Sequence, residues 1–203
     1  MQHVSVKSLT ISDEIAISAN YWVTVARPTA ACTLAATELA STHNGGARNI
    51  SITTLANEST ITLTVVGTGL DGVASGTTEV ITLPASATTE SATTLFSAIA
   101  SMTVSAQPSA NISVGFGTSC GQQVFAGRTV LRGLIMISGG VAGDVSFRNS
   151  SESGTSLFDY RTLGTENSPS HMTIPDNGVK FLSGLFVTYT LDVANQITQF
   201  YDG

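Results

Sequence analysis

NISITTLANESTITLTVV (Asn49–Val66) is the stretch of the chain that decides its fold class. On both sides of the polar segment 56–59, isoleucine, leucine and valine alternate with serine and threonine, as in strands that bury one face. Two such runs around a turn rich in asparagine and serine predict a β-hairpin. The same pattern predicts further short strands within 4–11, 21–25, 77–83, 102–104, 111–114, 130–138, 144–148, 155–160, 172–174, 184–190 and 196–201.

Segments with helical character are scarce. Only 34–42 and 91–101 have a composition that would allow a helix, and both are rich in serine and threonine, which weakens that prediction. Short strands spaced by 8–12 residues, with turn signals between them, are typical of β-sandwiches and small barrels. We therefore predict an all-β protein with two small antiparallel β-sandwich or barrel-like domains and an N-terminal arm.

The domain boundary is predicted in the glycine-rich, uncharged stretch 115–127. Residues 1–25 would then form the N-terminal arm or strand, 26–118 the first β domain and 119–203 the second β domain. The arm is expected to pair outside the domain that follows it in the chain.

Four apolar residues of this arm are the candidate partner-binding residues: Val4, Val6, Leu9 and Ile11. The first two share one strand phase and the last two share the other, which a regular half-buried strand would not do. A bulge near Lys7 would reconcile the two phases, and so would burial of both faces between two chains. We expect that removing residues 1–11 leaves a folded protein of nearly unchanged thermal stability that no longer binds its partner.

Composition excludes several classes of function. Charged residues make up 11% of the 203 residues, while 25 serines and 29 threonines supply much of the polar surface. The net charge of −6 argues against nucleic acid as a partner, because nucleic-acid binding needs a positive face. No apolar run reaches the ~20 residues that cross a bilayer, so no membrane partner is expected. Residues 1–18 contain no apolar run of the secretory type, so we expect no secretory signal.

Catalytic and metal-binding patterns are absent from the sequence. His3, His43 and His171 are scattered, and no G-x-S-x-G turn or short-spaced set of metal ligands accompanies them. Cys32 and Cys120 lie too far apart in sequence for a zinc motif, and the sequence leaves open whether they pair. Cys120 has no neighbouring base to activate it as a nucleophile. We predict no enzymatic activity, no cofactor and no metal.

Two parts of the chain resemble β domains of tailed-bacteriophage virion structural proteins. The first resemblance is carried by 48–84, RNISITTLANESTITLTVVGTGLDGVASGTTEVITLP, and by 99–119, IASMTVSAQPSANISVGFGTS. The second is carried by 129–160, which includes the strand-leading LRG and DVSFRN, by MTIPDNGVKFLSGLFVTY at 172–189, and by QITQFYDG at 196–203. The loop 67–76 is longer than in that pattern, and SATTLFSA stands where an aromatic-rich segment is usual.

The resemblance implies a virion structural protein, above all a capsid decoration or cement protein that binds and stabilises the head shell. Its partners would be the major capsid protein or other virion proteins, and its location the virion, assembled in the host cytoplasm. Open strand edges favour a homo-oligomer, with a trimer preferred. One alternative is a tail, neck or fibre component. Another is a carbohydrate-binding host-attachment module with an aromatic platform drawn from Phe158, Tyr160, Phe186 and Tyr189.

Overall fold

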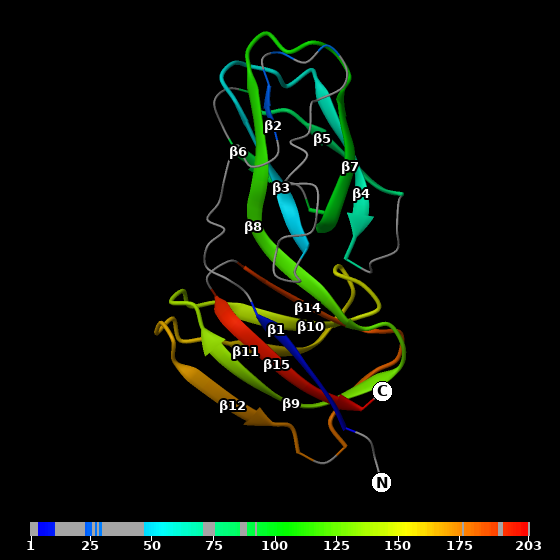
Figure 1. Ribbon diagram of the computed structural model, residues 1–203, viewed down its shortest axis with the longest axis vertical. Coiled ribbons are helices and arrows are strands. Elements are labelled where there is room, and N and C mark those ends of the chain that lie inside the picture. Colours follow the sequence, from blue (N-terminus) through cyan, green and yellow to red (C-terminus); the bar gives the residue numbers. More distant parts are fainter. Residues whose placement is uncertain are drawn as a thin grey trace. The chain divides into compact units, whose positions relative to one another are not determined.

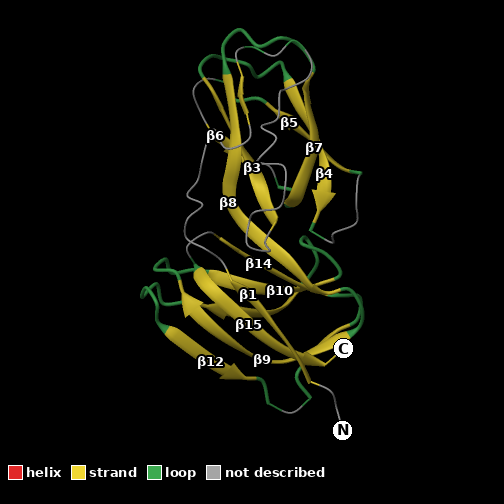
Figure 2. Ribbon diagram, viewed as in Figure 1, coloured by secondary structure: helices red, strands yellow, loops and turns green. Residues whose placement is uncertain are grey.

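The structure is a computed structural model that describes residues 4–10, 23–25, 27, 29, 47–70, 76–85, 89–91, 93–175, 177–190 and 193–202. All regular structure in these residues is β-strand, with no helix, so the all-β prediction is confirmed (Figure 2). The strands are β1 (Val4–Thr10), β2 (Val23–Val25), β3 (Ala47–Thr54), β4 (Thr62–Gly69), β5 (Thr77–Thr82), β6 (Thr89–Ser91), β7 (Phe96–Val104), β8 (Ile112–Phe125), β9 (Thr129–Ser138), β10 (Asp144–Asn149), β11 (Ser156–Arg161), β12 (Pro169–Thr173), β13 (Val179–Phe181), β14 (Leu185–Thr190) and β15 (Ala194–Asp202).

The chain forms two compact units. The N-terminal unit contains β2 and the described residues of 47–118, and the C-terminal unit contains β1 and the described residues from Ser119 onward. The division falls inside β8, between Thr118 and Ser119. This position lies within the glycine-rich stretch 115–127, and residues 115–125 of that stretch belong to β8. Glycines lack side chains but keep the main-chain groups that hydrogen-bond in a sheet, so a glycine-rich composition is compatible with a strand.

The C-terminal unit is a β-sandwich. One layer is a five-stranded antiparallel sheet in the order β1-β15-β9-β12, with β13 also paired to β9 (Figure 1). The other layer follows the order β11-β10-β14-β8. Inward side chains of both layers form one core, which includes Leu134 and Ile197 from the first layer and Phe147 and Val187 from the second. The sequence alternation along each strand supplies these inward residues.

The N-terminal unit is a sheet that curls around its own core. Its strands follow the order β8-β3-β7-β4-β5, with β2 on β8 and β6 on β3. The core is formed by apolar side chains of β3, β4, β5, β7, β8 and the turns next to β4 and β5: Ile50, Ile52, Ile61, Leu63, Val65, Ile81, Leu83, Phe96, Ile99, Met102, Val104, Ile112 and Val114. This unit thus has one core formed by side chains of one antiparallel sheet, in agreement with the predicted all-β fold.

The predicted hairpin of Asn49–Val66 is wrong in its pairing. β3 and β4 form as strands, but β7 lies between them in the hydrogen-bonded order. The connection is an arch held by Glu58, whose side chain is only 3% exposed. Its carboxylate accepts hydrogen bonds from the Ser109 amide at 2.8 Å, the Ser109 hydroxyl at 2.5 Å and the Ala110 amide at 3.0 Å. This long-range anchoring replaces the tight turn that a hairpin requires.

The helix considered for 91–101 is also wrong, because Ser91 ends β6 and residues 96–101 begin β7. Phe96 and Ile99 of this segment and Met102 just after it are spaced by three, as on a helix face. In the structure two register shifts between β4 and β7 add one residue each to β7, and all three side chains remain buried. The two bulges thus explain how apolar side chains three positions apart can all be buried in one strand. The other window, 34–42, lies outside the described residues, as does Trp22.

Candidate interaction surface

One face of the five-stranded sheet packs on the core, and the opposite face, called here the outer face, does not. Along β9, Leu131, Leu134 and Met136 are buried, whereas Arg132 and Ile135 are partly exposed. The outer face is made by partly or fully exposed side chains of β9, β12 and β15: Val130, Arg132, Ile135, Ile137, Pro169, His171, Thr173, Gln196, Thr198 and Phe200. Ile135 and Ile137 are in register with residues of this face on both β12 and β15. It is therefore a mixed surface with a substantial apolar component.

A hollow of about 380 Å³ lies on the outer face. Gly133 stands opposite Thr173 on one neighbouring strand and Phe200 on the other, so no side chain fills the space between them. A Cβ at this position would meet the Met172 carbonyl oxygen at 2.7 Å, so the close approach of β12 requires glycine. The hollow is lined by both apolar and polar groups, among them Ile135, Phe200 and His171.

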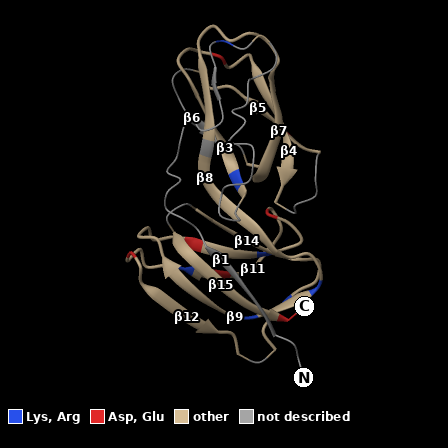
Figure 3. Cartoon of the chain, in the orientation of Figure 1, with Lys and Arg blue, Asp and Glu red and all other residues tan. Residues whose placement is uncertain are grey.

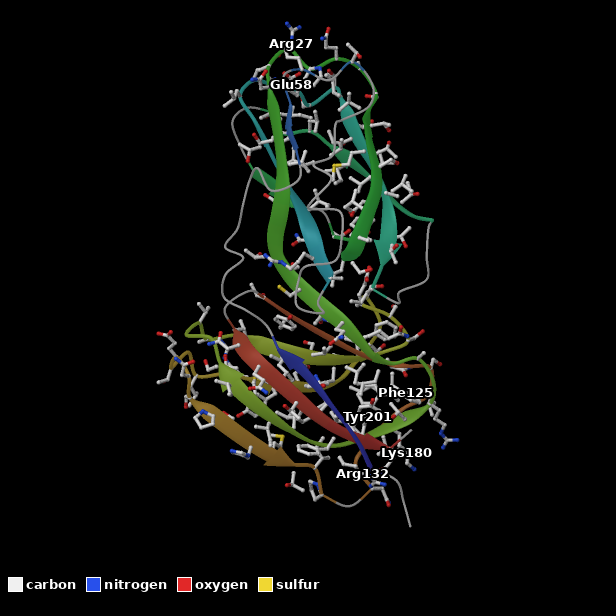
Figure 4. All side chains as sticks on the ribbon, viewed as in Figure 1. Arg27, Glu58, Phe125, Arg132, Lys180 and Tyr201 are labelled. Carbon is white, nitrogen blue, oxygen red and sulfur yellow. The ribbon has the colours of Figure 1, made fainter. Side chains whose placement is uncertain are left out.

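An ion pair borders the outer face near the end of β15. Arg132 Nη2 lies 2.6 Å from Asp202 Oδ2, and Arg132 Nε donates to the same oxygen at 2.6 Å. The two side chains are 25% and 19% exposed. Arg132 is labelled in Figure 4. Because the Asp202 carboxylate neutralises the Arg132 guanidinium, this pair adds little net positive charge to the outer face.

β1 carries three of the four predicted partner-binding residues. Val4 pairs in register with Asp202, Val6 with Phe200 and Leu9 with Ile197, while Ile11 lies outside the described residues. The register runs without a shift from Val4 to Thr10, so the bulge considered near Lys7 is not formed. Burial of both faces of this strand between two chains stays a prediction. β1 pairs outside the unit that follows it in the chain, at the edge of the five-stranded sheet.

Two buried polar atoms of β15 have no hydrogen-bond partner among the described residues: Gln199 Nε2 and Asp202 Oδ1. Gln199 is 1% exposed and stands opposite Leu134 on β9 and Lys7 on β1. Burying an amide without a partner costs about 1–3 kcal/mol.

We expect the substitution Gln199→Met to stabilise the protein by roughly 1 kcal/mol, because it removes the buried amide while keeping its volume. Denaturant unfolding of the two proteins measures the difference. If Gln199→Met is less stable than the parent, the amide has a partner and contributes to the sheet.

Of the residues weighed as catalytic candidates, the structure describes only His171 and Cys120, which lie on strands of different sheets. His171 is exposed on β12, Cys120 is buried in the core, and His3, His43 and Cys32 lie outside the described residues. Among described residues, no group of three or more His, Cys, Asp or Glu side chains could hold a metal ion. Charged side chains are sparse over the described strands (Figure 3).

The described carboxylates hold the β framework together. The hydrogen bond from the Ser146 hydroxyl, with that from Ser156, lowers the pKa of Asp159 below its ordinary value. Glu79 accepts hydrogen bonds from the amide and hydroxyl of Thr93 and from the amide of Thr94. Each carboxylate thus ties neighbouring strands or a loop to the sheet.

The aromatic platform considered for carbohydrate binding is not exposed. Phe186 and Tyr189 are 3% and 6% exposed, and Phe158 and Tyr160 are partly buried against the core. The Phe147 and Phe158 rings pack with centroids 5.7 Å apart. Tyr189, Phe158 and Tyr160 pack in or against the core of the sandwich, whereas Phe186 is buried but is not part of that core.

No family model matches the chain, and no curated protein matches it. Within the described residues there is no helix of the length and hydropathy needed to span a membrane. The outer face was not predicted from the sequence, because VLRGLIMIS supplies apolar residues to both sides of β9. The glycine at 133 within this run was the one available signal of a close backbone approach.

Proposed function

We propose that this chain is a structural protein of a tailed-bacteriophage particle, and specifically a capsid decoration protein that binds the outside of the head shell. The observation that carries the proposal is the outer face of the five-stranded sheet, a partly apolar, hollowed surface beside the terminal strand β1. The resemblance of 48–119 and of segments within 129–203 to phage β domains supports the same role.

Physical features of the two units favour binding over catalysis. Their cores are filled by strand side chains, and the carboxylates of Glu58 and Glu79 brace loops and strands through hydrogen bonds. A surface that combines Ile135 and Phe200 with threonine and histidine resembles protein interfaces, where an apolar centre is surrounded by polar groups. The partner is then a protein surface, namely the major capsid protein of the shell.

The substitution Ile135→Lys tests this role of the outer face. Ile135 is partly exposed and lines the hollow, so the fold should tolerate lysine, while a charge buried against the shell should weaken binding at least tenfold, as for an interface hot spot. The assay is sedimentation of the purified protein with heads that lack it. Val80→Lys, at a position 62% exposed on β5, is the matched control and should bind normally.

The proposal fails if Ile135→Lys binds heads as the parent does, or if neither protein binds heads at all. Copy number separates the head from the alternative tail, neck or fibre location. Quantitative mass spectrometry of particles should find hundreds of copies for a decoration protein, whereas a few dozen or fewer would assign the chain to the tail or neck.

A further inference from the structure

β1 is held in the C-terminal unit by a single strand. It pairs only with β15 among the described strands, antiparallel, through seven consecutive register pairs from Val4–Asp202 to Thr10–Gln196. The contact is thus a main-chain ladder at the end of a sheet, the form of recognition used when an extended segment adds to an exposed strand edge.

The chain order separates β1 from the unit that it completes. The next described strand, β2, belongs to the N-terminal unit and pairs with β8, and the rest of the C-terminal unit begins at Ser119. Twelve residues lie between Thr10 and Val23 and can span about 40 Å at most. In chain order β1 is therefore separated from the rest of its sheet by residues 11–22 and by the N-terminal unit, and no short turn joins it to β15.

Every copy of the chain has an acceptor edge that needs a strand. Without β1, the main-chain groups along Gln196–Asp202 would form an open edge beside the buried side chains of Ile197 and Tyr201. Open edges next to a core recruit other chains. Both buried polar atoms that lack a partner among the described residues belong to this same strand, at Gln199 and Asp202.

We propose that β1 is exchanged between copies of this chain, with β1 of one copy paired to β15 of another in the register seen here. The register pairs between β1 and β15 are the same whether the two strands belong to one copy or to two copies. Exchange therefore loses no β1–β15 contact, and oligomers form at low cost in free energy. Copies held close together on a particle would favour exchange further, since a tethered strand then has a high effective concentration. The inference concerns contacts between copies and does not depend on the proposed role in the head.

Disulfide trapping tests the exchange, because Ser8 and Thr198 are register partners. Two versions of the full chain with different affinity tags, one carrying Ser8→Cys and the other Thr198→Cys, are co-expressed in a Cys32→Ser background and then oxidised. Exchange predicts a disulfide-linked dimer that contains both tags. The buried Cys120 stays in place in both versions.

Two further variants keep the test decisive. In the negative control, the chain with Thr198→Cys is replaced by a chain with Ser170→Cys, a position on β12 at the other edge of the sheet. This chain should not cross-link to the chain with Ser8→Cys. The double variant Ser8→Cys/Thr198→Cys in one chain should form linked multimers. The proposal is overturned if no two-tag dimer forms, whether or not the double variant closes within one chain, or if the Ser170→Cys control cross-links equally well.

Discussion

Replacing Phe147 with alanine is expected to lower the free energy of unfolding by about 4 kcal/mol, as for a large aromatic side chain removed from a packed core. Phe147 is 0% exposed on β10, in register with Phe158 and Val187 of the neighbouring strands. The loss combines the transfer free energy of the ring with the cavity that it leaves. Urea unfolding followed by near-ultraviolet circular dichroism measures the change.

Leu163→Ala is the control for Phe147→Ala. Leu163 is the most exposed large apolar residue described, at 90%, so its truncation should change the free energy of unfolding by less than about 0.5 kcal/mol. Equal effects of the two substitutions would contradict the assignment of Phe147 to the core of the C-terminal unit.

Replacing Glu58 with glutamine is expected to cost about 2 kcal/mol at pH 7, because the hydrogen bonds from Ser109 and Ala110 lose their charged acceptor. The Ser109 hydroxyl bond, followed by the two backbone amide bonds, lowers the pKa of Glu58 below its ordinary value of 4.5, although burial acts in the opposite direction. Arg27 also lies near enough to lower this pKa, and it is labelled with Glu58 in Figure 4.

The sign of the pH dependence follows from that shift. A carboxyl whose pKa is lower in the folded protein stabilises it above the unfolded pKa of about 4.5, and this contribution is lost as the pH falls through the folded value. The stability difference between the parent and Glu58→Gln should therefore shrink below about pH 4.5. Chemical unfolding at a series of pH values measures it.

Glu79→Gln is the matched control for Glu58→Gln. Its carboxylate likewise accepts three hydrogen bonds, but two of them are exposed, so its effect should be smaller. A constant difference between the parent and Glu58→Gln from pH 3 to pH 7 would show that the Glu58 carboxylate is not the anchor of the arch.

Strand alternation was enough to predict the fold class and most strand positions. β3, β4 and β5 arise where β-branched residues alternate with threonine, and Pro84 follows the last of these strands as expected. The pairing of β3 and β4 was not predictable, because the polar turn between them is anchored by Ser109, about fifty positions away in sequence. Local pattern carries no information about such a distant contact.

The helix considered for 91–101 shows a second limit of predicting secondary structure from the spacing of apolar residues. Phe96, Ile99 and Met102 have the spacing of a helix face, and only the extra residues at two bulges reconcile that spacing with a strand. Bulges depend on the partner strand, here β4, where a Cβ at Gly67 would collide with the Ala98 carbonyl oxygen. The sequence of β7 alone contains no sign of this constraint.

The residues of the proposed interaction surface were only partly predictable. The N-terminal segment was proposed from its apolar residues Val4, Val6 and Leu9, but its register partner β15 lies at the opposite end of the chain. The outer face was missed because Ile135 and Leu134 are both apolar, although only Leu134 is buried. Burial on one side of a strand depends on which elements cover it, and a single sequence does not contain that information.

Electron cryomicroscopy of tailed-phage particles assembled in the presence of this chain tests the proposed function most directly. We predict density for both β units on the outside of the head shell, with the outer face of the five-stranded sheet against the major capsid protein. Density for this chain only in the tail or neck, or its absence from the particle, would contradict the account.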